Sequence, residues 1–526
     1  MRRANRRMAV LGAVAAAAAF GLAGCGGGGG GGTPDPAPPV GTGTGAGSGT
    51  GTGSTGSTGG TGSACVAASQ QTPVSVTQVS VLARSAAVAA AQGGLTARAA
   101  LAPRARQVAL AEVTPAKLAS ETSLSGLGGG PRKVGFARAL PAAALDWQTL
   151  ADGRKAASLS VTSPAARAVR LGLLVRSLPA DATVRLYAQG ASEGFEVPAT
   201  EVLAALKATA AAGATGDAAR TYWAPAVNGA EVTLEVSLPA GGDTALVDVA
   251  VPQLSHLFAL PTYDDGASAS VKPKIGEAAS CEIDAACDAS FQAESNAVAR
   301  IVFVDQGAAY QCTGTLLNDQ LGSGTPYLLT ANHCISTQAA ATTLQSYWFY
   351  RAPTCGAGTL NPAATTRTGG ATLLYASAGT DTSFMRLNTA APAGATYAGW
   401  SVAAPPVTAP VATLHHPEGD VLKLSQGTVK SYQNCTVSSS GLTCSTSTDG
   451  SGSFVDAVFT SGSTEEGSSG AALFQTINGS RYVIGQLYGG SSSCSVRAGS
   501  NIYGRFDAAY NSALKQWLAA PVVPTC

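Results

Sequence analysis

Beyond residue 131, the chain alternates between short apolar runs and turns rich in glycine, proline and serine. Such runs are too short for most buried helices and are typical of β-strands. They lie at residues 156–161, 168–175, 183–188, 231–236, 245–251, 298–304, 327–329, 343–350, 372–375, 383–387 and 482–487. In this part of the chain, helical periodicity is confined to residues 201–212 and 508–518. We therefore predict an all-β protein, with a small β-sandwich over residues 132–260 and a second β body over residues 276–526 that ends in a helix.

The N-terminus has the features of an export signal. Several arginines precede an apolar run from Met8 to Leu22, which is too short to cross a bilayer. The ending Leu22-Ala23-Gly24-Cys25 resembles the lipobox of bacterial lipoproteins, whose cysteine carries the lipid. We expect residues 1–24 to be removed and Cys25 to hold the chain at a membrane, the outer one where a bacterium has two, since Gly26 rather than Asp follows. An ordinary signal peptide with a chance cysteine is the alternative.

Low-complexity sequence and linkers separate the folded regions. Residues 25–64 consist mainly of glycine, threonine, serine and proline, have nothing to bury, and are predicted to form a disordered tether. Residues 65–131 are rich in alanine and contain patterns that suit a helix, and we assign them no function. Residues 261–275 are polar and contain proline and glycine, so we predict a linker that proteases can reach.

Composition excludes several classes of function. The formal net charge is +1 and only 12% of the residues are charged, which gives no basis for binding nucleic acid. Eleven cysteines occur without a Cys-x-x-Cys pair and with only four histidines, so disulfides in an oxidising compartment explain them better than zinc does. A lipid on Cys25 would leave an even number of cysteines. We expect a monomer with no metal and no organic cofactor.

A glycine-rich turn at residues 464–470 leads into an apolar strand and places Ser469 on a tight bend. Gly467 and Gly470 flank this serine. Glycine lets the backbone curl there, so that the N–H groups of Gly467 and Ser469 can point into one space, which is the geometry of an oxyanion hole. The same sequence also suits a structural loop between strands. The case for catalysis by Ser469 therefore depends on partners elsewhere in the chain.

His333 is the candidate base for Ser469. A serine hydroxyl is a poor nucleophile unless a base accepts its proton, and histidine has a suitable pKa. His333 follows the strand at residues 327–329 and precedes Cys334, which could lock its loop. A histidine beside a cysteine also suits a purely structural role. Of the other histidines, we expect His256 to pack in the N-terminal region and residues 415–416 to shape a loop.

Asp381 is the candidate acid that would orient the imidazole and stabilise its charge. It stands at the start of an apolar strand, after Gly379-Thr380, where an ordinary turn aspartate is the alternative. The three candidates occur in the order His, Asp, Ser, which is the order in the two-barrel serine proteases. Their spacing leaves His333 and Asp381 in one half of the C-terminal body and Ser469 in the other.

At this point the sequence resembles a known family. Residues from about 276 to 526 look like the chymotrypsin-like serine proteases, and among them most like bacterial lysyl endopeptidase. The matching stretches are Cys281-Glu282-Ile283-Asp284, Cys312-Thr313-Gly314, Leu328-Leu329-Thr330-Ala331-Asn332-His333-Cys334, His415-His416-Pro417, Gly467-Ser468-Ser469-Gly470, Gly485-Gln486-Leu487-Tyr488-Gly489-Gly490 and Tyr503-Gly504-Arg505. The resemblance implies two six-stranded β-barrels, a Ser-His-Asp triad acting through an acyl-enzyme, and protein or peptide substrates. It also implies a zymogen whose N-terminal region is a propeptide, with cleavage near Lys274–Gly276.

The resemblance also implies a set of disulfides, Cys281–Cys494, Cys287–Cys355 and Cys312–Cys334, the last of which would pin the loop of His333. Cys435 and Cys444 are close enough in sequence to close a hairpin by themselves. Cys65 and Cys526 are left over, and parity suggests that they pair. Such a bond would keep the protease on its tether after the linker is cut.

The chain departs from the family pattern at the residue before the nucleophile. Animal enzymes of this fold have Asp there, ready to pair with a newly cut N-terminus, whereas this chain has Ser468. We therefore expect folding assisted by the propeptide rather than activation by a charged terminus.

Specificity is the second departure. The acid that selects lysine in the lysyl enzymes corresponds to Asn501, and the acid of other trypsin-like enzymes to Ser463. Because a buried ammonium needs a paired charge, a preference for lysine is doubtful. Tyr488 stands where the lysyl enzymes carry a histidine, and we place Tyr488 and Gly489 in the pocket wall. Residues 465–466 are two glutamates that we expect in a solvated loop, with a place at the pocket rim as the alternative.

A second class of function remains open, in which a surface lipoprotein uses the protease fold and the β-sandwich to bind protein or glycan. The presence of all three candidate catalytic residues argues against it. An α/β-hydrolase is disfavoured because Ala471 breaks the Gly-x-Ser-x-Gly pattern and the order of the triad differs.

Overall fold

The computed structural model describes residues 105–123, 130–191, 193–259, 275–438 and 441–519, together with the backbone of short strands at 75–76, 79–80 and 95–97. The predicted signal peptide, Cys25, the tether, Cys65, Cys526 and all but the last residue of the predicted linker lie outside these ranges. In the described parts of the chain, no helix is long and apolar enough to span a membrane.

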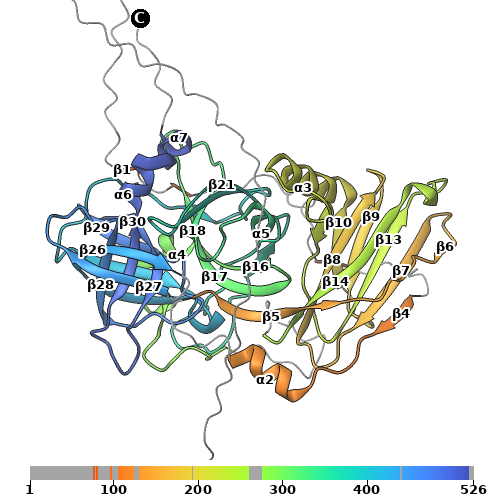
Figure 1. Ribbon diagram of the computed structural model, residues 1–526, viewed down its shortest axis with the longest axis horizontal. Helices are drawn as coiled ribbons and strands as arrows, with labels where there is room; N and C mark the ends of the chain where they lie inside the picture. Colours follow the sequence, from red (N-terminus) through yellow and green to blue (C-terminus); the bar gives the residue numbers. More distant parts are fainter. Residues whose placement is uncertain are drawn as a thin grey trace, which may run out of the picture. The chain divides into compact units, whose positions relative to one another are not determined.

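The N-terminal region is a β-sandwich (Figure 1). One sheet has the order β3-β10-β9-β13-β7-β4, with β6 on the free part of β7. The other has the order β11-β8-β14-β5, with β12 also on β8. Their apolar faces enclose one core, to which Leu159, Leu171 and Leu234 contribute. The strands are β3 (Leu95–Ala97), β4 (Arg106–Ala109), β5 (Arg132–Ala139), β6 (Trp147–Thr149), β7 (Lys155–Thr162), β8 (Ala168–Ser177), β9 (Thr183–Tyr187), β10 (Glu193–Pro198), β11 (Thr221–Trp223), β12 (Val227–Asn228), β13 (Glu231–Leu238) and β14 (Asp248–Leu257).

Two α-helices accompany the sandwich within the described residues. Helix α3 (Ala199–Ala211) begins directly after Pro198 and buries Val202 and Ala205 against the core. Helix α2 (Pro115–Ser123) lies in the alanine-rich segment. The strand predicted at residues 245–251 starts later, at Asp248, because the side chain of Asp243 accepts a hydrogen bond from Ala245 N and caps a 3-10 turn.

The first half of the C-terminal body is a curved sheet with the order β20-β19-β16-β17-β18-β22-β21. Its strands are β16 (Val298–Asp305), β17 (Ala308–Leu317), β18 (Tyr327–Ala331), β19 (Gln345–Trp348), β20 (Thr365–Arg367), β21 (Ala371–Ser377) and β22 (Thr382–Leu387). Helix α5 (Gln338–Thr342) packs beside β21 and has Thr343 as its C-cap, so β19 is shorter than the run predicted at 343–350.

The second half is a closed barrel. Its strands follow the order β30-β29-β25-β26-β28-β31, and β31 pairs again with β30, which closes the ring. The bounds are β25 (Pro410–His415), β26 (Lys423–Ser438), β28 (Phe454–Ser461), β29 (Ala472–Ile477), β30 (Ser480–Gly490) and β31 (Asn501–Arg505). Three short strands add to this barrel: β15 (Ile283–Asp284), β24 (Trp400–Ser401) and β27 (Gly441–Ser447). Strand β1 (Ser75–Val76) pairs with β24, and β2 (Val79–Ser80) pairs with β23 (Thr396–Tyr397).

The C-terminal helical segment packs where the two halves meet. It runs through α6 (Phe506–Ala509), a π-helical turn (Tyr510–Leu514) and α7 (Lys515–Leu518). A further short helix, α4 (Gln292–Ser295), lies before β16. Trp400 contacts the rings of Phe506 and Tyr510 in the shared core. The predicted fold class is confirmed: a chymotrypsin-like all-β body with a terminal helix follows a β-sandwich, and of its two barrels one is closed and the other is a half-barrel.

The described residues contain four disulfides, and they join the cysteines that the sequence suggested. They are Cys281–Cys494, Cys287–Cys355, Cys312–Cys334 and Cys435–Cys444. The Cys312–Cys334 bond ties β17 to the loop that carries His333, and Cys435–Cys444 joins β26 to β27.

Candidate active site

His333 and Asp381 form a hydrogen-bonded pair at the end of the first sheet. Nδ1 of His333 lies 2.8 Å from Oδ2 of Asp381, and the amide of His333 donates to Oδ1 at 2.9 Å. The neighbouring amide of Asn332 donates to the Asp381 carbonyl at 2.9 Å. Asp381 is buried and holds a left-handed backbone angle, φ 48°. These contacts fix one face of the imidazole and direct its other nitrogen away from the carboxylate.

The second barrel holds the aspartate in place. The Nε2 amide of Gln486, on β30, donates to the carbonyl of Thr380 at 2.7 Å and to the hydroxyl of Thr382 at 3.0 Å. Strand β22 begins at Thr382, which pairs with Ala331 on β18 immediately before the loop of His333. The pair is therefore built by both halves of the body.

The turn that carries Ser469 packs directly against the strand that leads to His333. Gly470 has φ 82°, and a Cβ on it would lie 2.8 Å from the amide nitrogen of Ala331 on β18. The amide of Thr313 on β17 donates to the Ser469 carbonyl at 2.8 Å, and its hydroxyl donates to the Gly467 carbonyl at 2.9 Å. The two glycines predicted at this turn are thus required by close approach and by positive φ.

The hydroxyl of Ser469 contacts a residue far away in the sequence. It donates to the carbonyl of Gly130 at 3.4 Å, just before β5. Nε2 of His333 is buried and, among the described residues, has no hydrogen-bond partner. The ring of Tyr488 lies beside the imidazole, with centroids 4.9 Å apart. Tyr488, which the sequence predicts in a pocket wall, therefore lies beside the candidate base.

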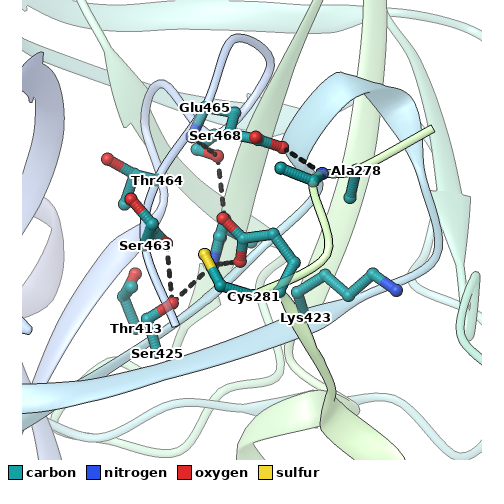
Figure 2. A network of polar contacts seen from close by, with 12 residues as sticks. Ala278, Cys281, Thr413, Lys423, Ser425, Ser463, Thr464, Glu465 and Ser468 are labelled. Carbon is teal, nitrogen blue, oxygen red and sulfur yellow. Dashed lines mark hydrogen bonds and ion pairs between the residues drawn. The ribbon is translucent and has the colours of Figure 1, made fainter. Parts of the chain in front are cut away.

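A network of buried polar side chains lies behind the serine turn (Figure 2). Ser468 Oγ lies 2.8 Å from Nδ1 of His415, whose Nε2 lies 3.1 Å from Ser425 Oγ and 3.6 Å from a carboxylate oxygen of Glu282. Ser425 in turn donates to the carbonyl of Ser463 at 2.6 Å. Burial raises the pKa of Glu282 to about 8 and lowers the pKa of His415 to about 3, which favours the neutral form of both groups.

The positions assigned to the specificity pocket are joined by hydrogen bonds. Oδ1 of Asn501 accepts from Thr464 Oγ1 at 2.7 Å and from Ser492 Oγ at 2.6 Å. Its Nδ2 donates to the carbonyls of Ala457 and Gly499 at 3.1 and 3.4 Å. The side-chain amide of Asn501 therefore uses both lone pairs and both hydrogens within the protein.

The other pocket positions lie close to Asn501. Ser463 Oγ donates to Ser492 Oγ at 3.1 Å, so it belongs to the same chain of hydroxyls. Gly489 pairs with Ile502 across β30 and β31, next to the residue pair that contains Asn501. The structure brings Ser463, Gly489 and Asn501 close together, and Tyr488 lies beside His333.

Residues 465–466 are half-buried rather than solvated. Glu465 Oε2 accepts a hydrogen bond from the amide of Ala279 at 3.1 Å, because the segment after the predicted linker runs over this turn. Burial raises the pKa of Glu466 to about 7, and the nearby Glu418 adds to the effect.

The remaining histidines have structural surroundings. His416 is fully buried, with Nδ1 3.0 Å from the Asp420 carbonyl, and burial lowers its pKa to about 3. His256 is buried in the sandwich, 2.8 Å from Ser163 Oγ and stacked on Phe136. Both placements agree with the loop and packing roles expected from the sequence.

Sequence reasoning did not find the contact between Gly130 and Ser469, nor the roles of Glu282 and Glu418. The only local signal is the run of glycines before Pro131, which predicts a turn or extended chain but not its destination. Nothing in the local sequence distinguishes Glu282 from an exposed glutamate. In the described ranges, no cluster of His, Cys, Asp and Glu side chains is arranged to hold a metal ion.

Comparisons with known proteins identify two matching families of domain. Residues 103–258 match the lysyl endopeptidase N-terminal domain, and residues 275–504 match the lysyl endopeptidase C-terminal domain. A curated relative, lysyl endopeptidase of Pseudomonas aeruginosa, is 34% identical over 370 residues, which cover 66% of this chain and 72% of the relative.

Solved structures with similarity include the MamO protease domain from Magnetospirillum magneticum, with 10% identity and a TM-score of 0.29 over 42% of this chain and 98% of that one. The Rv3671c protease from M. tuberculosis has 14% identity and a TM-score of 0.29, and the match covers 45% of this chain and 88% of that one. The family assignment rests on the sequence matches. The chain belongs to the lysyl endopeptidase family of serine endopeptidases.

Proposed function

We propose that this serine endopeptidase acts through Ser469 as nucleophile, His333 as general base and Asp381 as the group that orients the base. The observation that carries the proposal is the His333–Asp381 pair, 2.8 Å apart, at the strand end against which the Ser469 turn packs. A buried carboxylate on Nδ1 favours the tautomer whose Nε2 can accept a proton.

In the proposed reaction, Nε2 of His333 takes the proton of the Ser469 hydroxyl while Oγ bonds to the substrate carbonyl carbon. The tetrahedral intermediate collapses when the imidazolium gives its proton to the leaving amine, and the C–N bond breaks to leave an acyl-enzyme. Water then attacks, with His333 again as base, and releases the acid and the free serine. All of these steps use groups of the protein and water alone.

The amides of Gly467 and Ser469 are proposed to stabilise the oxyanion. The turn geometry supports this role, because Gly467 has φ 87° and its carbonyl is held away by Thr313 Oγ1 at 2.9 Å. Between them, the amide of Ser468 donates to the Glu465 carbonyl at 3.1 Å. Preorganised donors of this kind typically contribute about 3 kcal/mol each to stabilising the transition state.

A fluorophosphonate probe tests the proposal, since it reacts with activated serines. We expect mass spectrometry of processed wild-type protein to locate the label on Ser469, and we expect no label after Ser469→Ala. His333→Ala should slow labelling by a factor of about a thousand or more. Labelling of another serine, or unchanged labelling of His333→Ala, would refute the assigned roles and favour a binding protein.

We further propose that the pocket prefers an uncharged side chain before the cleaved bond. Asn501 carries no charge, and its Oδ1 already accepts hydrogen bonds from Thr464 and Ser492, so its side chain offers no free acceptor to an ammonium group. A lysine buried there would lose its hydration without a paired charge. Cleavage of a peptide library by the processed enzyme measures this preference, and a strong preference for lysine would contradict it.

The precursor organisation is also a proposal. We propose export through residues 1–24, lipid on Cys25, a tether over residues 25–64, and cleavage near Lys274–Gly276 that separates residues 132–260 from a monomeric protease. The match of the N-terminal domain model to residues 103–258 supports the precursor arrangement. Metabolic labelling with palmitate should mark the wild-type chain but not Cys25→Ala. A label that persists in the variant would exclude lipidation at this cysteine.

A further inference from the structure

A strand of the N-terminal region adds to the edge of the protease sheet beside the catalytic serine. Strand β17 pairs with β18 through residues 315–317, which leaves the beginning of that edge open. Strand β5 occupies the open part in antiparallel register, with Arg132 opposite Gln311 and Lys133 opposite Tyr310 (Figure 1). Extended peptides commonly bind proteins by adding a strand in this way.

The segment before β5 passes the nucleophile. The carbonyl of Gly130 accepts a hydrogen bond from Ser469 Oγ at 3.4 Å. Residues 130–133 therefore lie across the serine as an extended chain, with one carbonyl at the hydroxyl and the following residues paired to β17. Consider a substrate that follows the same path, with its attacked carbonyl in the place of the Gly130 carbonyl. Its second residue after the scissile bond would then lie where Arg132 lies.

Two carboxylates hold the side chain of Arg132. Its Nε lies 3.0 Å from Oε2 of Glu418, and its Nη2 lies 3.2 Å from Oε2 of Glu277. The arginine side chain is only 15% exposed, so these ion pairs are largely shielded from solvent. Charge-assisted hydrogen bonds of this kind are stronger than neutral ones and favour a planar guanidinium.

The turn that carries Glu418 is shaped for this contact. Glu418 has φ 51°, a strained angle for a residue other than glycine. Its amide donates to the carbonyl of Glu466 at 2.7 Å, which fixes the turn beside the serine loop. A Cβ on Gly419 would lie 3.1 Å from Nη1 of Arg132, so the glycine leaves room for the guanidinium.

We infer that Glu418, with Glu277, forms a subsite for a basic side chain at the second residue after the cleaved bond, and that Arg132 fills this subsite in the precursor. The inference rests on the proposed role of Ser469 as nucleophile. It concerns the leaving side of the substrate, and it is separate from the pocket around Asn501, which lies on the acyl side. In this subsite, the backbone of Gln311 pairs with the substrate chain, and the carboxylate of Glu418 pairs with the basic side chain.

The charges around the subsite set its dependence on pH. Burial raises the pKa of Glu418, Arg132 lowers it, and the neighbouring Glu465 and Glu277 raise it again. When the basic side chain leaves, the carboxyl loses the group that favours its ionised form. Preference for a basic residue should therefore weaken as the pH falls and Glu418 becomes protonated.

Internally quenched peptides test the subsite in the processed enzyme. The peptides share a cleaved sequence and differ only at the second residue after the bond, which is arginine, its neutral analogue citrulline, or glutamate. We expect kcat/KM for arginine to exceed that for citrulline by roughly ten- to a hundredfold, as for a shielded charge-assisted contact. Glutamate should be cleaved most slowly.

Enzyme variants locate the effect. Glu418→Gln should remove most of the difference between arginine and citrulline, whereas Asp449→Asn, which removes a charge from the exposed turn between β27 and β28, should preserve it. Equal rates for arginine and citrulline in the wild type, or an undiminished difference in Glu418→Gln, would overturn the inference. If Ser469 takes no fluorophosphonate label and no peptide is cleaved, the proposed function fails first.

The full-length precursor gives an independent test. We compare the rate at which the fluorophosphonate labels the unprocessed band in wild type, in Arg132→Gln, and in Arg154→Gln, whose arginine pairs with Asp152 in the sandwich. Arg132→Gln should label roughly tenfold faster, corresponding to about 1.4 kcal/mol, and Arg154→Gln should match the wild type. Equal labelling of Arg132→Gln and wild type, in proteins that melt at the same temperature, would contradict occupation of the subsite by Arg132.

Discussion

Glu282→Gln tests the buried network behind the serine turn. The side chain of Glu282 is fully buried and lies 3.6 Å from Nε2 of His415. Burial raises its pKa from 4.5 to about 8, and the nearby Glu465 adds to the increase. Glutamine has nearly the same shape and cannot ionise, so the substitution removes the titration while keeping the packing.

The magnitude follows from the difference in pKa between the folded and unfolded chain. One pKa unit corresponds to about 1.4 kcal/mol, so a shift from 4.5 to about 8 corresponds to about 5 kcal/mol. Below pH 4.5 the carboxyl is protonated in both states, and the stabilising contribution of the protonated group is fully present. Between pH 4.5 and about 8 only the unfolded chain ionises, so the wild type loses up to this amount of stability as the pH rises.

Urea denaturation followed by tryptophan fluorescence measures the effect at several pH values, in a Ser469→Ala background that removes the proposed nucleophile. We expect Glu282→Gln to match the wild type or to be slightly less stable near pH 4.5, and to be more stable by roughly 3 to 5 kcal/mol near pH 8. Glu112→Gln, at an exposed position, is the control and should follow the wild type. Parallel curves for wild type and Glu282→Gln between pH 5 and 8 would refute a neutral, buried carboxyl.

Three further substitutions test other parts of the site. Asn501→Asp introduces a carboxylate opposite the hydroxyls of Thr464 and Ser492, and should raise the kcat/KM ratio of lysine over glutamine substrates by roughly tenfold or more; an unchanged ratio would place the pocket elsewhere. Asp420→Asn weakens a side chain that accepts from the amides of Gly276 at 3.1 Å and Ala278 at 3.2 Å, and should reduce the free energy of unfolding by roughly 1–3 kcal/mol in urea denaturation. Gly470 has a positive φ, and a Cβ on it would lie 2.6 Å from the Thr313 carbonyl. Gly470→Ala should therefore lower the free energy of unfolding by about 3 kcal/mol or more and abolish labelling of Ser469. The control Gly479→Ala, at φ 81° with open space around it, should lower that free energy by about 1 kcal/mol.

Much of the fold could be predicted because its strands are short, apolar and separated by clear turns. The runs at residues 168–175 and 298–304 lie inside β8 and β16, since both strands are buried along most of their length. The predicted strand boundaries were wrong where a side chain forms a hydrogen bond with a backbone amide and delays the start of the strand. Asp243 did so before β14, and Thr343 did so before β19, where its hydroxyl accepts from the amide of Val304 at 2.7 Å. The pattern of apolar residues along the sequence does not predict such capping hydrogen bonds.

For the candidate site, the chemistry of the side chains and their order along the sequence predicted the candidate catalytic residues but not the segments that surround them. His333, Asp381 and Ser469 were selected because their side chains have complementary roles and occur in a known order. The expectation that residues 465–466 lie in a solvated loop was wrong, because the chain near Ala279 covers Glu465. Contacts between segments more than a hundred residues apart, such as Gly130 with Ser469, leave no trace in local sequence.

Several contacts of the serine turn are made by neutral groups, and this bears on how the proposed precursor could become active. Ser468 contacts His415, whose lowered pKa keeps it uncharged, and the turn is closed by Thr313 and by its own backbone. No new charge is needed to form a turn that already has these bonds. The hydroxyl of Ser469, however, is engaged by Gly130, and Nε2 of His333 has no partner among the described residues. Activation of the proposed precursor should therefore depend on displacing Gly130 together with strand β5, and a cleaved precursor that retains this segment should remain slow to label with the fluorophosphonate.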